Sequence, residues 1–140
     1  YAKENNSEVL LISAKIESEI SQISDMQDKQ DFLESLGLKE TGLKRVIKKG
    51  YEILNYINYF TAGEKELRAW TIIKGTFAPS AAGTIHSDME KGFIRAETIS
   101  YDDYIANNGE AGAKEKGKLR LEGKEYEVKD GDVMHFLFNV

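Results

Sequence analysis

A short segment near the end of the 140-residue sequence concentrates positively charged side chains. Within seven positions it holds four cations, which are Lys114, Lys116, Lys118 and Arg120. Ammonium and guanidinium groups at this density can contact the phosphates of a nucleic acid. Glu110, Glu115 and Glu122 dilute the positive charge, however, so a solvated surface loop explains the pattern equally well. The segment is a candidate phosphate contact with an ordinary alternative.

Three further cations, Lys74, Lys91 and Arg95, extend this candidate surface if they share a face with it, which the sequence does not decide. The whole chain carries 19 Lys+Arg against 24 Asp+Glu, a formal net charge of -5. Because this net charge repels a polyanion, binding of nucleic acid through bulk charge is disfavoured, and any contact has to be local.

Two histidines, His86 and His135, are the side chains best suited to ligate a metal ion or to transfer a proton near neutral pH. No carboxylate pair lies at ligand spacing from either of them, and the chain has no cysteine to supply a thiolate. Asp88, two residues after His86, fits a turn cap. We therefore expect both histidines to be hydrogen-bonded structural residues, with no metal site and no catalytic residue in this chain.

The composition, with 41% apolar and 31% charged residues, is typical of a folded globular protein. Its apolar runs are far shorter than the roughly 20 residues of a membrane-spanning helix. The absence of cysteine from the sequence favours a reducing compartment. We expect a cytoplasmic protein without a membrane partner.

The elements that position these side chains differ between the two parts of the chain. Residues 9–12 are apolar and branched, which predicts a strand buried on both faces. Apolar residues at helical spacing then predict one helix, or two broken near Ser24 and Asp25, and a further helix that is capped by Thr41 and reaches Ile57. The pattern is that of the end of an α/β domain.

The second part of the chain, residues 57–140, has the pattern of an α+β domain, a small sheet with a helix across one face. Its predicted strands are residues 67–74, 93–100 and 133–139, with a hairpin of 119–122 and 126–128 around Gly123. We predict a short helix at 79–86, a turn or short helix at 101–105 and a loop at 107–117. Trp70, alone in an alternating strand, is either packed, the commoner case, or an exposed stacking surface.

Several stretches of the second part resemble a known family. PSAAGTIHSDMEKGFIRA, residues 79–96, and EGKEYEVKDGD, residues 122–132, resemble the helix-to-strand segment and the closing turn of TGS domains. The surrounding segments resemble the YchF family of Obg-like P-loop NTPases; they are YFTAGEKELRAWTI, ISYDDYI, GEAGAKEKGK and VMHFLFNV. The resemblance extends over nearly the whole chain.

This resemblance implies a fold and a division into domains. Residues 57–140 would be a TGS domain with the β-grasp, ubiquitin-like fold. Residues 1–56 would be the last strand and helices of the α/β P-loop G domain. Ser13, Ala14 and Lys15 resemble the fifth guanine-nucleotide motif, where backbone amides would face the nucleotide base once the rest of the G domain is present.

The sequence contains no G-x-x-x-x-G-K-[ST] motif to hold phosphates. We therefore expect this chain to be a C-terminal fragment without nucleotide hydrolysis or a cofactor of its own, from a parent ATPase or GTPase that uses ATP or GTP with Mg²⁺. The resemblance implies that the TGS domain engages the ribosome or RNA and packs on its own G domain. The alternative is a structural lid that transmits the nucleotide state without touching nucleic acid.

Overall fold

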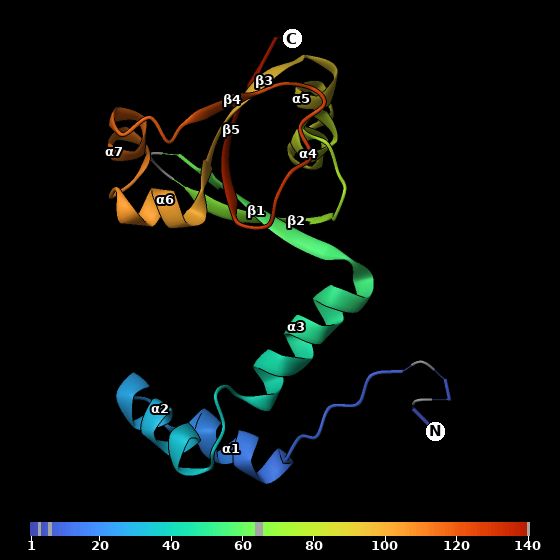
Figure 1. The fold of residues 1–140 in the computed structure, drawn as a ribbon, viewed down its shortest axis with the longest axis vertical. Coiled ribbons are helices and arrows are strands. Elements are labelled where there is room, and N and C mark those ends of the chain that lie inside the picture. The colour runs from blue at the N-terminus through green and yellow to red at the C-terminus, as the bar shows by residue number, and fades with distance from the viewer. Residues whose placement is uncertain (3, 6, 64–65, 140) are drawn as a thin grey trace. The chain divides into compact units, whose positions relative to one another are not determined.

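The computed structural model describes residues 1–140 with the exception of 3, 6, 64, 65 and 140. The chain divides into two compact units, residues 1–53 and 54–140 (Figure 1). Over the described residues, none of the helices has the length and apolar character that crossing a membrane requires.

The first unit is built from three helices, α1 (Ala14–Gln22), α2 (Met26–Ser35) and α3 (Gly42–Leu54), the last of which ends at the unit boundary. The carboxylate of Asp25 accepts hydrogen bonds from the amides of Gln27 and Asp28 at 2.8 and 3.1 Å, so two helices flank the predicted break. The Thr41 hydroxyl accepts a hydrogen bond from the Lys44 amide at 3.1 Å, which confirms the predicted cap of α3.

Two predictions for the first unit were wrong. Residues 9–12, predicted as a strand, have no regular secondary structure, and Val9 and Leu11 are 68% and 85% exposed. A strand requires a neighbour for its backbone hydrogen bonds, and the described part of the first unit contains no strand to pair with. The helix predicted to reach Ile57 ends at Leu54, since Asn55 has a φ of 54° and turns the chain into a strand.

The second unit has a five-stranded mixed sheet with the strand order β2-β1-β5-β3-β4. Its strands are β1 (Tyr56–Ala62), β2 (Leu67–Ile73), β3 (Phe93–Ser100), β4 (Arg120–Glu122) and β5 (Asp132–Phe138). β1 is antiparallel to β2 and parallel to β5, and β3 is antiparallel to both β5 and β4. The last strand of the chain thus lies at the centre of the sheet.

One face of the sheet carries the hydrophobic core. The helix α4 (Ala78–Ile85) packs there through three alanines, Ala78, Ala81 and Ala82, that have no exposed surface. Alanine lets the helix approach closely enough for Tyr59 of β1 to donate a hydrogen bond from its hydroxyl to the Ala81 carbonyl at 2.9 Å. Burial raises the pKa of Tyr59 to about 12. A short helix α5 (Ser87–Lys91), which the sequence did not predict, follows α4.

Two short helices, α6 (Tyr101–Ala106) and α7 (Glu110–Glu115), lie on the other side of the sheet from α4 and α5 (Figure 1). The short helix at 101–105 is confirmed, but the loop predicted at 107–117 is wrong because it contains α7. The fully buried Ala113 anchors α7. The helix is followed by Gly117, whose φ of 69° lets the Lys118 amide donate to the Ala113 carbonyl at 2.8 Å.

The predicted hairpin around Gly123 does not form. β4 pairs with β3, with Thr98 opposite Arg120. Residues 126–128 run instead beside the chain before α4, where Glu127 bridges Phe77. Both stretches satisfy their backbone groups with segments far away in the sequence, which a local turn signal cannot reveal.

Candidate functional site

The cationic segment predicted from the sequence is carried by α7 and the residues that follow it. Lys114 lies in the last turn of α7 and Lys116 caps its end. Both are exposed, and neither makes an ion pair or hydrogen bond through its ammonium group with the residues the structure describes. The ammonium of Lys118 lies 3.3 Å from the carboxylate of Asp103. Lys114 and Lys116 are therefore the members of the segment that are available to an outside anion.

The Asp103 carboxylate is held ionised by its surroundings. Its pKa is lowered chiefly by the hydrogen bond that the Ser100 hydroxyl donates to it at 2.8 Å, and further by the nearby Lys118 ammonium. Lys118 thus has a permanent negative partner near neutral pH, which reduces its value as a phosphate contact.

Arg120 is engaged in a network of polar side chains. Its guanidinium lies 3.0 Å from Glu122 and 3.4 Å from Asp132, and it donates to the Tyr126 hydroxyl at 3.0 Å. The Tyr126 hydroxyl donates in turn to Asp132 at 2.7 Å. Burial, followed by the contact with Asp132, raises the pKa of Tyr126. Because Asp132 is only 3% exposed, Arg120 compensates a buried charge and is not free for a phosphate.

Two of the other predicted cations, Lys74 and Lys91, lie apart from the α7 segment. Lys74 follows β2 at one edge of the sheet, whereas Arg120 lies in β4 at the opposite edge. Lys91 ends α5, on the other side of the sheet from α7. Arg95 is exposed on β3, opposite Leu137. The structure therefore brings together Lys114, Lys116 and Lys118 and leaves Lys74 and Lys91 apart from them.

Ser13, Ala14 and Lys15 form the start of α1 in the first unit. The Ser13 hydroxyl accepts a hydrogen bond from the Ile16 amide at 3.4 Å, and Ala14 and Lys15 begin the helix. Within the described part of the chain the amides of Ala14 and Lys15 have no hydrogen-bond partner. The three residues thus make a capped helix start, with Lys15 3.9 Å from Glu19.

The helix start is tied to α3 by long-range contacts. The Glu17 carboxylate accepts hydrogen bonds from the amides of Gly42 and Leu43 at 2.7 and 3.2 Å, at the N-terminal end of α3. Arg45 of α3 donates to the Leu11 carbonyl at 3.3 Å. Between these contacts lies a cavity of about 220 Å³, which Ser13 also lines.

Trp70 is packed, the commoner of the two alternatives considered for it. It is half-buried, contacts the hydrophobic core and donates its indole N–H to the Thr61 hydroxyl at 2.9 Å. The guanidinium of Arg68 lies 5.6 Å from its ring centroid. The indole therefore contributes to the packing of the sheet and is not an exposed stacking surface.

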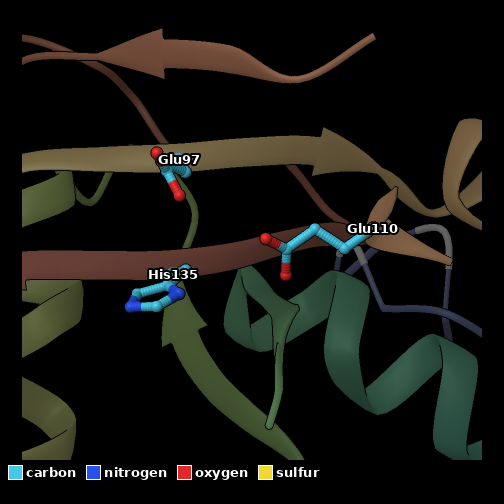
Figure 2. A group of neighbouring side chains, drawn as sticks. All are labelled: Glu97, Glu110 and His135. Atoms are coloured by element: carbon cyan, nitrogen blue, oxygen red, sulfur yellow. The ribbon is translucent and has the colours of Figure 1, made fainter. Parts of the chain in front are cut away.

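A group of side chains that sequence reasoning missed lies at the sheet face beside α7. Glu97 of β3 and His135 of β5 are direct cross-strand partners, and Glu110 is the first residue of α7. Each offers a ligand atom, and these atoms all lie within 4.8 Å of one another. Figure 2 shows the Glu110 carboxylate directed toward the space between Glu97 and His135. No local pattern could indicate this group, because the three residues are far apart in the chain and are brought together by the strand register and the position of α7.

Comparisons with known proteins identify relatives of the chain. The profile of the family YchF-GTPase_C, described as a protein of unknown function (DUF933), matches residues 56–139. A Bacillus subtilis protein named ribosome-binding ATPase YchF is 59% identical over 140 residues, which are 100% of this chain and 38% of that protein. A protein of the same name from Escherichia coli O157:H7 is 57% identical over 139 residues, which are 99% of this chain and 38% of that protein.

A solved structure is similar in fold as well as in sequence. The structure of the Schizosaccharomyces pombe YchF GTPase has a TM-score of 0.80 and 37% identity, and the match covers 94% of this chain and 34% of that one. The chain therefore spans little more than a third of the length of these relatives.

Proposed function

This chain belongs to the YchF family, and from that premise we propose that its second unit is a TGS domain of the β-grasp fold through which a nucleotide-hydrolysing protein engages the ribosome. The observation that carries the proposal is the 59% identity, over the full chain, with a protein named ribosome-binding ATPase. A small mixed sheet with α4 packed across one face supports the β-grasp assignment.

The contact surface in this proposal is the α7 segment. Lys114 and Lys116 are exposed and free of ion pairs with the described residues, so a phosphate of ribosomal RNA does not have to displace a carboxylate from them. Two ammonium groups at one helix end give a local positive site on a chain whose net charge is -5. Since ribosomes act in the cytoplasm, the proposal also places the protein there.

The first unit, in the same proposal, belongs to a nucleotide-binding G domain. Ser13, Ala14 and Lys15 start a helix whose first amides are free of partners within the described chain, as a base-reading segment requires. The exposed apolar residues at 9–12 would then be covered by the sheet of that domain. ATP or GTP with Mg²⁺ would be held mainly by residues outside this chain. The bacterial relatives are named ATPases and the yeast relative a GTPase.

The test uses the full-length protein that carries this chain. The double variant Lys114→Glu with Lys116→Glu should weaken co-sedimentation with ribosomes. Each lost phosphate contact should also reduce the slope of log affinity against log salt by about 0.7 to 0.9. Hydrolysis of nucleotide without ribosomes should stay unchanged.

The matched control is Lys74→Glu with Lys91→Glu, which makes the same charge change at exposed lysines of other elements. Equal weakening by both double variants would show that bulk charge, and not α7, governs binding. Normal ribosome binding by the α7 variant, together with altered hydrolysis, would favour a lid that transmits the nucleotide state.

A further inference from the structure

Glu97, Glu110 and His135 reach one place from three separate elements. Glu97 and His135 are opposite one another in the antiparallel pair of β3 and β5, so their side chains leave the sheet on the same face. Glu110 approaches that face from α7 (Figure 2). The sheet register and the position of α7 together define the arrangement, which makes it a preformed feature of the second unit.

The convergence of the two carboxylates lacks a compensating cation within the described chain. No ion pair or hydrogen bond joins Glu97 or Glu110 to a described basic side chain. The nearby cations are engaged elsewhere, Lys118 with Asp103 and Arg120 with Glu122 and Asp132. Because two carboxylates repel one another at this range, their approach favours capture of a positive ion.

The space between the three side chains has the size of a single ion. A cavity of about 10 Å³ is lined by Glu97, Glu110 and His135, and this volume suffices for about one water molecule. Its remaining walls are mostly aliphatic, from residues that include Leu119 and Val133. His135 is exposed and Glu97 is only partly buried, so an ion can reach the three side chains from solution.

The donor set selects among cations. Two carboxylate oxygens and one imidazole nitrogen suit transition-metal ions, whereas Mg²⁺ and Ca²⁺ prefer oxygen ligands alone. Tetrahedral ligands about 2.1 Å from a shared ion lie about 3.4 Å apart, so the ligand atoms have to close by up to about 1.4 Å from their 4.8 Å limit. Glu110, at the start of a short helix, can supply this by rotation of its side chain.

We propose that Glu97, Glu110 and His135 form a binding site for a divalent transition-metal ion of the Zn²⁺ class. Three protein ligands leave the remaining coordination positions to water. The bound ion links α7 to β3 and β5, so it stabilises the second unit and slows the opening of α7. This inference stands on the geometry of the second unit and is independent of the ribosome proposal.

The experiment titrates the full 140-residue chain with Zn²⁺ by calorimetry and with Co²⁺ by visible absorption. We expect one site, and each of Glu97→Gln, Glu110→Gln and His135→Gln should weaken Zn²⁺ binding by about tenfold or more, since even indirect partners of metal ligands cost that much. Zn²⁺ should also raise the melting temperature of the unmodified chain and leave that of His135→Gln unchanged.

Two matched controls change the same residue types outside the site. His86→Gln removes the second histidine of the sequence, and Glu115→Gln removes another glutamate of α7. Both should bind Zn²⁺ as the unmodified chain does. Affinity that survives His135→Gln, or that falls as much in His86→Gln, would overturn the site.

A measurement on the unmodified chain avoids dependence on the folding of variants. Paramagnetic Mn²⁺ should broaden the amide resonances of residues around Glu97, Glu110 and His135 before others. Broadening centred on His86 and Asp88, whose side chains lie 3.5 Å apart, would place the ion elsewhere and overturn the proposal. Absence of broadening and of Zn²⁺ binding would do the same.

Discussion

At the scale of single residues, the second unit depends on the hydrogen bonds made to the buried carboxylate of Asp132. Asp132 accepts a hydrogen bond from the Lys129 amide at 2.9 Å in addition to those from Tyr126 and Arg120. Several donors compensate the burial of this carboxylate, and the loss of one donor leaves it undercompensated. The strand β5, at the centre of the sheet, begins with this residue.

Tyr126→Phe removes the hydroxyl that donates to Asp132 and accepts from Arg120. We expect the free energy of unfolding of the second unit to fall by about 1 kcal/mol, the usual effect of one lost hydrogen bond to a buried group. Urea denaturation measures it. Tyr101→Phe is the matched control, because the Tyr101 side chain is half-exposed and its hydroxyl has no hydrogen-bond partner among the described residues. An equal loss in both variants would contradict the role assigned to the network.

The raised pKa of Tyr59 predicts that the folded state loses stability at alkaline pH. Its pKa is about 12 in the folded chain and near 10 when exposed, so the unfolded state loses the phenolic proton first. The associated stability is complete below pH 10 and is lost as the pH rises from 10 to 12, by about 2 kcal/mol. Urea midpoints across that range should fall, and less steeply in Tyr59→Phe. An unchanged slope in Tyr59→Phe would assign the loss to other groups.

At the scale of elements, α7 is held close to the chain that precedes it. A Cβ at Gly112 would overlap the carbonyl oxygen of Asn107, whereas one at Gly50, in the middle of α3, would meet nothing within 4 Å. Alanine favours a helix over glycine by about 1 kcal/mol in both places, so only the surroundings separate the two sites.

Gly112→Ala and Gly50→Ala should therefore have opposite effects. We expect Gly50→Ala to stabilise α3 by about 0.5 to 1 kcal/mol, and Gly112→Ala to destabilise the second unit because backbone has to move. Amide hydrogen exchange of α3 and of α7 distinguishes the two. Slower exchange of α7 in Gly112→Ala would show that the helix is not packed against Asn107 as described.

At the scale of the whole molecule, the two units differ in how far each contains the elements that independent folding requires. The second unit contains every strand of the described chain and its hydrophobic core, whereas the first exposes apolar residues at 9–12. In the proposed function the missing cover is the sheet of a G domain. The phosphates of a nucleotide would also be held there, since the sequence of this chain lacks the glycine-rich motif that cradles them.

The chain by itself should show no measurable affinity for ATP or GTP. Phosphate binding requires the amide cradle, its lysine and the bound Mg²⁺ together, and the base contacts proposed for Ser13, Ala14 and Lys15 would contribute too little without them. Calorimetry with Mg²⁺ present is the measurement, with the full-length protein as the positive control. Micromolar affinity of the 140-residue chain for either nucleotide would contradict the assignment of the first unit to a divided G domain.

The sequence by itself determined those features that depend on neighbouring residues. It predicted β3 at residues 93–100 with the bounds that the structure has, and the Thr41 cap of α3. Helical spacing of apolar residues, helix caps and the alternation of apolar and polar residues are properties of a few consecutive side chains. They can be recognised when the rest of the molecule is unknown. The family was also evident from contiguous motifs.

Only the tertiary structure decided the features that depend on residues far apart in the chain. It paired β4 with β3 in place of a hairpin, engaged Arg120 with Asp132, and left residues 9–12 without a strand to join. It also brought Glu97, Glu110 and His135 to one place, through the register of β3 and β5. Register is set by the burial of a whole sheet face, to which every strand contributes, so no local pattern encodes it.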